Sequence, residues 1–172
     1  WALRWYAFDV DYEMYGKDLI SSAELAREFV SIMGGTPPVN FHYELFLDEH
    51  NQKISKSKGN GISLEQWFTY ATPESLATYM FNRPQSGKKL YFDVIPRAVD
   101  DYLTFVEKFP TQDAATKIDN PAWHIHGGNV PQNQTNLSFN ILLNLAGVAS
   151  AESTEAMWGY IKAYAPGATP EN

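Results

Sequence analysis

The stretch from Lys53 to Asn60 combines residue types that can bind phosphate. Its sequence, Lys-Ile-Ser-Lys-Ser-Lys-Gly-Asn, places three ammonium groups and two hydroxyls on a polar, glycine-containing loop. Hydroxyl and backbone N–H groups can hydrogen-bond phosphate oxygens, and positioned lysines neutralise charge that develops during phosphate chemistry. The glycine and asparagine after the lysines let the loop bend, close on a nucleotide and reopen. An ordinary lysine- and serine-rich surface loop would have the same composition.

The first third of the chain predicts alternating helices and strands. We expect a helix at 1–8, a strand at 11–15, a helix at 19–33 and a half-buried strand at 39–47. In the second helix, Leu25, Phe29 and Ile32 recur at helical spacing, and two glycines follow as the stop signal. Ligands of open α/β sheets bind at the carboxyl ends of strands. The turn of Gly16, Lys17 and Asp18, which follows the first strand, is therefore a second candidate site.

The remaining chain predicts a hairpin arm, a connecting segment and helices. Residues 53–55 are expected to pair back on the preceding strand after a turn at 48–52. Ser63 with Gln66 matches a capping box, and Thr72-Pro73 has the residues of a helix start. Further helices are expected after residue 96, at 137–149 and at 152–165, with a break at about 110–121. The predicted fold class is α/β followed by mainly α.

Composition excludes several classes of protein. The formal net charge of -7 argues against a general nucleic-acid-binding surface, so any contact with RNA should be local. Six of the thirteen lysines and arginines fall in one short region: Lys53, Lys56, Lys58, Arg83, Lys88 and Lys89. The chain has no cysteine, so it has no disulfide framework, and no run is apolar enough to predict a membrane helix.

The string Lys53 to Ser57 is similar to the KMSKS signature of class I aminoacyl-tRNA synthetases, with Ile54 in the methionine position. Other stretches, in order along nearly the whole chain, resemble the class I lysyl-tRNA synthetases in particular. They are Gly16 to Asp18, the strand Phe41 to Leu47, Pro73 to Leu76, Leu90 to Pro96 and Trp123 to Gly128. Glutamyl-tRNA synthetases share the class but usually carry arginine where Ser57 stands here.

The resemblance implies an enzyme that activates lysine with ATP to lysyl-adenylate and transfers it to tRNA(Lys). Lys56 would be the principal ATP-contacting lysine, and Lys53 the second catalytic lysine. Ser55 and Ser57 would support them in binding ATP. The implied cofactor is ATP with Mg²⁺, the implied partners are lysine and tRNA(Lys), and the implied location is the cytoplasm without membrane attachment. No protein-bound metal site is predicted.

The same resemblance assigns a fold to each part of the chain. Residues 1–62 would form the C-terminal part of a Rossmann catalytic domain with its KMSKS loop. Residues 63–118 would form a stem-contact and connecting region, and residues 119–172 the start of the α-helical anticodon-side domain. Gly16, Lys17 and Asp18 would lie on the nucleotide side of the sheet. The alternative for this turn is a structural lysine followed by a helix-capping aspartate.

The chain departs from the family pattern in lacking the HIGH motif. The string His-Ile-His-Gly at 124–127 has a different order and follows the KMSKS-like loop, and we expect it to be a loop. Its two histidines could bind a metal, but no third ligand is evident nearby. Because the chain starts at Trp1 and ends in a polar tail, we expect an internal fragment. Because the HIGH motif is missing, we expect this fragment to be inactive by itself. Its unpaired sheet edge would make it prone to self-association.

Three alternatives remain at the level of the sequence. The chain could belong to another class I synthetase, chiefly a glutamyl-type enzyme, because most of the amino-acid pocket is missing. The isolated chain could be a non-catalytic module that binds tRNA. Finally, the KISKS string could be accidental in a protein with a lysine-rich surface, although several other stretches would then have to match by coincidence.

Overall fold

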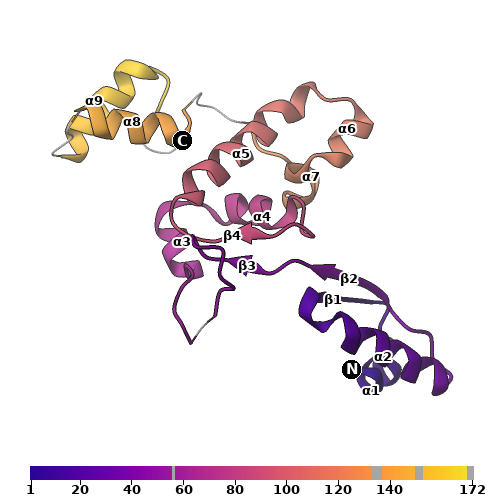
Figure 1. The fold of residues 1–172 in the computed structure, drawn as a ribbon. Helices are drawn as coiled ribbons and strands as arrows, with labels where there is room; N and C mark the ends of the chain where they lie inside the picture. Colours follow the sequence, from indigo (N-terminus) through magenta and orange to yellow (C-terminus); the bar gives the residue numbers. More distant parts are fainter. Residues whose placement is uncertain (56, 133–136, 150–152, 170–172) are drawn as a thin grey trace. The chain divides into compact units, whose positions relative to one another are not determined.

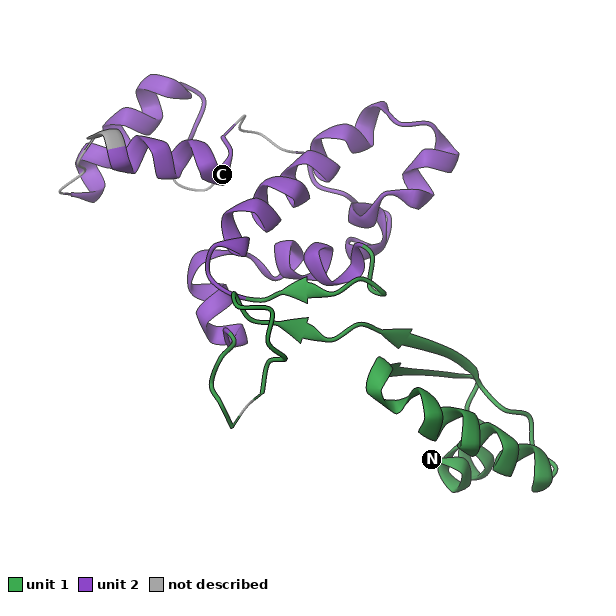
Figure 2. Ribbon diagram, in the orientation of Figure 1, with its two compact units in different colours: residues 1–61, 83–90 green, residues 62–82, 91–172 purple. Residues whose placement is uncertain are grey.

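A computed structural model describes residues 1–55, 57–132, 137–149 and 153–169 (Figure 1). The chain forms two compact units, which Figure 2 shows in green and purple. Unit 1 comprises residues 1–61 and 83–90, and unit 2 comprises residues 62–82 and 91–172. Among the described residues, strands occur only in unit 1, whereas unit 2 is helical. No helix in these described stretches is both long and apolar enough to span a membrane.

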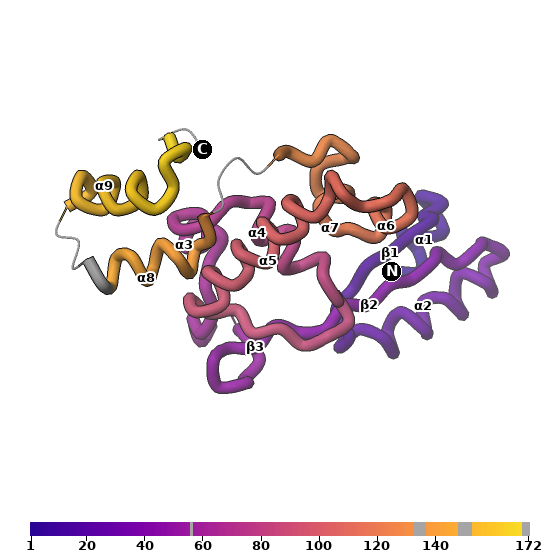
Figure 3. The backbone as a smooth tube through the Cα atoms, turned by 90° about the horizontal axis from the view of Figure 1, so that it is seen from above, coloured from indigo at the N-terminus to yellow at the C-terminus, as the bar shows by residue number. Residues whose placement is uncertain are grey.

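Unit 1 begins with the alternation of helices and strands that the sequence predicts. Its first elements are α1 (Ala2–Phe8), β1 (Tyr12–Gly16), the short 3-10 helix η1 (Lys17–Leu19), α2 (Ile20–Ile32) and β2 (Val39–Tyr43). Strands β1 and β2 pair in parallel, from Tyr12 opposite Val39 to Gly16 opposite Tyr43. Because α2 connects two parallel neighbours, β1, α2 and β2 form a βαβ unit, and Figure 3 shows α2 running beside the strands.

The core of unit 1 lies between α1, β1 and one face of α2. This face is not the one that carries the apolar residues noted in the sequence for their helical spacing. Its buried side chains are Trp5, Tyr15, Ala23, Ala26 and Val30. The apolar residues at helical spacing in α2, Leu25, Phe29 and Ile32, are instead exposed by 54%, 50% and 79%. The helix was thus predicted correctly but its buried face was not. Small alanines face the core, where they allow α1 and α2 to approach closely.

The single strand expected at 39–47 is wrong, because the structure divides it into two strands of different sheets. β2 ends at Tyr43, and β3 (Phe46–Leu47) pairs in parallel with β4 (Lys88–Lys89). The break falls at Glu44, whose N–H donates to the carbonyl of Pro84, 2.9 Å away. The Glu44 carboxylate also accepts the N–H of Leu45. Because of these bonds, residues 44 and 45 do not continue the pairing of β2 with β1.

The predicted hairpin before the KISKS loop is confirmed. Leu47 forms an antiparallel bridge with Lys53, and the N–H of Ile54 donates to the carbonyl of Phe46, 3.0 Å away. The turn between the two arms runs from Asp48 to Gln52. Strand β3 therefore has the returning arm at Lys53 as a neighbour as well as β4, which joins from a distant part of the sequence.

Unit 2 begins with the two capped helices that the sequence predicts, α3 (Leu64–Tyr70) and α4 (Pro73–Phe81). Ser63 and Gln66 form both hydrogen bonds of a capping box, and the Thr72 hydroxyl accepts the N–H of Ser75. Trp67 is fully buried and its indole N–H donates to the Ser75 hydroxyl at 3.3 Å. The side chain of Trp67 thereby joins the two helices.

The other helices of unit 2 follow the expected order. They are α5 (Val94–Lys108), the 3-10 helix η2 (Phe109–Thr111), α6 (Ala114–Asp119), α7 (Pro121–Ile125), α8 (Phe139–Ala149) and α9 (Thr154–Tyr164). Helices α4, α5 and α7 pack against one another. The segment at 110–121, expected to be a break, contains α6 and the start of α7. The loop expected at 124–127 is partly wrong, because His124 and Ile125 belong to α7, which Pro121 starts at its first position.

Candidate functional site

The predicted turn at the end of β1 has a backbone that brings Asp18 back over Gly16. Gly16 is the last residue of β1, and η1 starts at Lys17. A Cβ atom at Gly16 would lie 2.8 Å from Oδ1 of Asp18, closer than ordinary contact. The absence of a side chain at Gly16 therefore allows the Asp18 carboxylate to lie against the strand end.

Lys17 forms an ion pair with Glu44, the residue that directly follows β2. Its ammonium lies 2.5 Å from Oε1 of Glu44. The hydrogen bond from Lys17, followed by the N–H of Leu45, holds the pKa of Glu44 below its ordinary value of 4.5. The carboxylate is therefore charged at neutral pH. This contact supports the structural interpretation of Lys17, since its cation has a partner within the protein.

Asp18 connects the two predicted parts of the site. Its Oδ2 accepts a hydrogen bond from the ammonium of Lys53 at 3.0 Å, although the residues are 35 positions apart. The hydrogen bond from Lys53 is the largest cause of a pKa of Asp18 below its ordinary value. The turn after β1 and the first lysine of the KISKS string therefore lie side by side within unit 1.

The loop itself is a tight turn with its hydroxyls together. The hydroxyls of Ser55 and Ser57 are 2.9 Å apart, and the N–H groups of Lys58 and Gly59 both donate to the Ser55 carbonyl. Gly59 bends the chain with φ of 61°. The sequence assigned part of this bending to Asn60, which has no such positive φ. Lys56, the predicted principal ATP contact, lies outside the described residues.

The base of the loop is held by Asp48, which the sequence did not assign to the site, and by Asn60, to which it assigned only bending of the loop. The Asn60 side chain accepts the N–H of Ser55 at 2.9 Å and donates to the Asp48 carboxylate at 2.7 Å. The signal for Asp48 is its place directly after a strand and before a turn, where aspartate side chains often accept backbone N–H groups. No local pattern indicates that Asp48 and Asn60 meet.

The histidines of the His-Ile-His-Gly string have partners in unit 2. Nε2 of His126 lies 2.9 Å from the hydroxyl of Tyr102, and Nε2 of His124 lies 2.7 Å from the carbonyl of Ile118. His124 also stacks on Phe81, with ring centroids 5.1 Å apart. In the part of the chain that the structure describes, no three His, Cys, Asp or Glu residues are grouped so that they could hold a metal ion.

Comparison with known proteins identifies the family. The sequence profile of the family described as tRNA synthetases class I (K) matches residues 1–129. The chain belongs to this family of class I tRNA synthetases. Among curated proteins, it is 50% identical over 169 residues to a lysine–tRNA ligase of Roseobacter denitrificans. It is also 49% identical to enzymes of that name from Rickettsia rickettsii and Rickettsia felis.

These relatives are much longer than the chain. Each match covers 98% of the chain but only 32% or 33% of the relative. The chain therefore spans about a third of the length of the curated relatives it matches. The resemblance to class I lysyl-tRNA synthetases, drawn from the KISKS string and the other stretches, is confirmed at the level of the family.

Proposed function

We propose that this chain is the part of a lysine–tRNA ligase that carries the ATP-contacting loop and the elements that follow it. The observation that carries the proposal is the ion pair between Asp18 and Lys53, which joins the turn after β1 to the KISKS loop. Similarity to lysine–tRNA ligases along nearly the whole chain supports lysine as the amino acid. The longer protein to which the chain would belong is called the full-length protein below.

In the proposed reaction, the carboxylate of lysine attacks the α-phosphorus of ATP. The bond to pyrophosphate breaks, and lysyl-adenylate forms. A terminal hydroxyl of tRNA(Lys) then attacks the carbonyl carbon of the adenylate, and AMP leaves. In the first step negative charge builds up on the departing pyrophosphate, so fixed cations and hydrogen-bond donors lower the barrier without a covalent intermediate on the protein.

The KISKS loop has the groups that this first step needs. Lys53 and Lys56 would neutralise the phosphate charge, and the hydroxyls of Ser55 and Ser57 would donate to phosphate oxygens. Lys53 and Asp18 have side chains exposed by 58% and 49%, so their ion pair is a surface pair that costs little to break. Lys53 would therefore exchange Asp18 for a phosphate oxygen when ATP binds.

The turn after β1 would bind the nucleoside end of ATP. Gly16 leaves room for the Asp18 carboxylate beside the strand end, and this charged carboxylate would accept a hydrogen bond from a ribose hydroxyl. Lys17, the third residue assigned to nucleotide binding, would hold the turn in place through its ion pair with Glu44. Mg²⁺ would arrive with the phosphates of ATP, because it keeps much of its hydration shell and needs few protein ligands.

The proposal also covers the layout of the chain. The βαβ unit of β1, α2 and β2 supports the assignment of residues 1–62 to a Rossmann catalytic domain. The assignments of residues 63–118 to a stem-contact region and of residues 119–172 to the start of an anticodon-side helical domain rest on the resemblance. A cytoplasmic location and the partners lysine, ATP and tRNA(Lys) belong to the same proposal.

Lysine-dependent ATP–pyrophosphate exchange on the full-length protein tests the function. We expect exchange with lysine but not with glutamate, and a fall of about 100-fold or more in Lys56→Ala, the size expected for losing one transition-state contact. Lys108→Ala, which removes a lysine at the end of α5, is the matched control and should keep full activity.

Exchange with glutamate instead of lysine would move the protein to the glutamyl-type alternative. Full activity in Lys56→Ala would mean that the loop lysine has been assigned wrongly. The isolated 172-residue chain should show no exchange, because it contains no HIGH motif. Exchange by the isolated chain, abolished by Lys56→Ala, would contradict its proposed inactivity.

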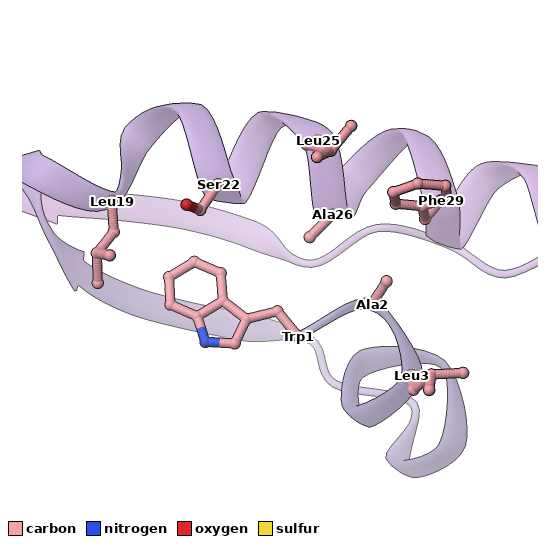
Figure 4. Close-up of a pocket in the computed structure, with 8 residues that line it drawn as sticks. All are labelled: Trp1, Ala2, Leu3, Leu19, Ser22, Leu25, Ala26 and Phe29. Carbon is pink, nitrogen blue, oxygen red and sulfur yellow. The ribbon is translucent and has the colours of Figure 1, made fainter.

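The surface of unit 1 supports the expected self-association of the isolated chain. A pocket of about 540 Å³ between α1 and α2 is lined largely by apolar side chains, among them Trp1, Leu19 and Phe29 (Figure 4). Large apolar side chains are also exposed elsewhere on these elements, such as Phe8 at 78% and Ile32 at 79%. Size-exclusion chromatography of the isolated chain should show a concentration-dependent increase in size. A monomer at all concentrations would contradict this expectation.

A further inference from the structure

Asn60 closes the KISKS loop into a ring. Its Oδ1 accepts the backbone N–H of Ser55 at 2.9 Å, and its Nδ2 lies 3.3 Å from the carbonyl of Lys53. One amide side chain thus contacts the backbone on both sides of Ile54. The loop leaves this point after Ser55 and returns to it at Asn60, so a displacement of Asn60 would move the start of the loop.

Asp48 determines which way the Asn60 amide faces. Oδ2 of Asp48 lies 2.7 Å from Nδ2 of Asn60. A charged carboxylate can only accept hydrogen bonds, so the NH₂ group of Asn60 must face it. The carbonyl oxygen of Asn60 is then directed at the N–H of Ser55. Reversal of the amide would leave two acceptors facing each other at Asp48 and two donors facing each other at Ser55.

Asp48 is itself fixed by the turn that it begins. Only 8% of the residue is exposed, and its Oδ1 accepts the N–H groups of His50 at 3.0 Å and Gln52 at 2.8 Å. The N–H of Gln52 and then the Asn60 amide are the main causes of a pKa of Asp48 below its ordinary value. The carboxylate therefore stays charged at neutral pH and keeps its role as acceptor.

We propose that Asp48 and Asn60 are positioning residues that hold the start of the KISKS loop for adenylate formation. They contact neither lysine nor ATP in this proposal, and they act through the backbone of Lys53 and Ser55. The inference rests on the function proposed above. A loop with a fixed start has less freedom to lose when it closes on ATP, so the lysines reach the phosphates with less entropic cost.

The pair allows a test in which the hydrogen bonds are first broken and then restored. In the full-length protein, Asn60→Ala removes all three hydrogen bonds of the amide, those with Ser55, Lys53 and Asp48. Asn60→Asp alone sets two carboxylates against each other. The double variant Asp48→Asn with Asn60→Asp exchanges donor and acceptor: Asn at 48 donates to Asp at 60, whose other oxygen still accepts the Ser55 N–H. In place of the 3.3 Å contact with the Lys53 carbonyl, the exchange sets a carboxylate oxygen against that carbonyl, so a part of the loss should remain.

Kinetics of ATP–pyrophosphate exchange give a readout beyond folding. We expect kcat to fall about 10- to 100-fold in Asn60→Ala and at least as far in Asn60→Asp, because displacements near 1 Å cost up to about 100-fold. KM for lysine should stay within about twofold, since the lysine-binding contacts are untouched. The double variant should recover most of the lost kcat. Glu49→Gln removes a neighbouring carboxylate of the same turn without touching Asn60, and should behave as wild type.

The outcomes separate this inference from the proposed function. If Lys56→Ala is inactive while Asn60→Ala keeps wild-type kcat, the positioning role is wrong and the function stands. If Lys56→Ala is fully active, the function proposed for the loop is wrong, and the positioning role that rests on it is wrong as well. Loss of activity in proportion to the unfolded fraction, measured by circular dichroism on the same samples, would reduce Asp48 and Asn60 to structural residues. A double variant no better than Asn60→Asp would also overturn the inference.

Discussion

Gly61 lies directly against the isoleucine of the KISKS string, which makes Gly61→Ala a steric probe of the loop. A Cβ atom at Gly61 would lie 2.7 Å from Cγ2 of Ile54 and 3.1 Å from its Cδ1. Ordinary van der Waals contact begins at 3.4 Å, so the closer contact is too short by about 0.7 Å. Isoleucine is branched at Cβ and has few rotamers, so it must shift together with its backbone.

The size of this shift sets the expected effect. Displacements near 1 Å cost up to about 100-fold in rate, so a shift of about 0.7 Å predicts a loss of about 10- to 50-fold in kcat. Overpacking destabilises well-packed cores by about 1–3 kcal/mol, and a half-buried site should lie at the lower end of that range. The assay is lysine-dependent ATP–pyrophosphate exchange on the full-length protein, with a urea unfolding curve for each sample.

A matched control is Gly159→Ala in α9, where an added Cβ atom meets nothing within 4 Å. Alanine in place of a mid-helix glycine should stabilise the protein by about 0.5–1 kcal/mol and leave exchange unchanged. Wild-type kcat in Gly61→Ala would refute the reasoning, because it would show that a shift of Ile54 does not reach the reacting groups. A loss of activity that follows the unfolded fraction would refute it as well.

Three further predictions concern the framework around the loop. Trp67→Ala should destabilise unit 2 by about 3–5 kcal/mol, seen as a lower urea midpoint, because it empties a fully buried site. The pKa of Glu44 lies below 4.5, so the stabilisation from its charge is complete above pH 4.5 and is lost as pH falls through the lower folded value. Lys17→Met should raise that pKa, measured by NMR titration of the Glu44 carboxyl; an unchanged value would contradict the ion pair. Asp100 accepts the N–H of Phe139 at 2.6 Å and so caps α8. Asp100→Ala should cost about 0.5–2 kcal/mol and increase hydrogen exchange in α8, and unchanged exchange there would argue against the cap.

Features encoded by neighbouring residues could be predicted from the sequence. The capping box of Ser63 and Gln66 and the start of α4 at Thr72-Pro73 were predicted and are present. Each depends on hydrogen bonds or backbone restrictions within about one helical turn. The βαβ order and the hairpin before the loop were predictable for the same reason, since turn residues and periodicity mark them locally.

Features that depend on distant partners could not be predicted in this way. The spacing of Leu25 and Phe29 indicated a helix but could not show that Ala23 and Ala26 form its buried face. Residues 39–47 alternate in the way that a single strand does. The strand nevertheless ends before Glu44, whose N–H bonds to Pro84 and whose carboxylate pairs with Lys17. The buried face of α2 and the end of the strand both depend on contacts between residues that are far apart in the sequence.

The candidate site shows the same division. The residue types and spacing of the KISKS string identified the loop, and the carboxyl end of β1 identified the turn at Asp18. The contact between Asp18 and Lys53 was not predicted, because the two residues lie 35 positions apart. The pairing of Asp48 with Asn60 was not foreseen, because aspartate and asparagine also suit ordinary turns and nothing local distinguishes a pair that meets across a loop.

The interruption of unit 1 by residues 62–82 has a consequence for folding during synthesis. The hairpin that carries the KISKS loop pairs with β4, whose residues leave the ribosome almost thirty positions after the loop. At about 5–20 residues per second, the hairpin would wait one to several seconds for that neighbour. Helices α3 and α4 form local contacts and can fold in the interval. The support of the loop is therefore completed late, and the nascent chain exposes an unpaired β3 edge until residues 88–90 emerge.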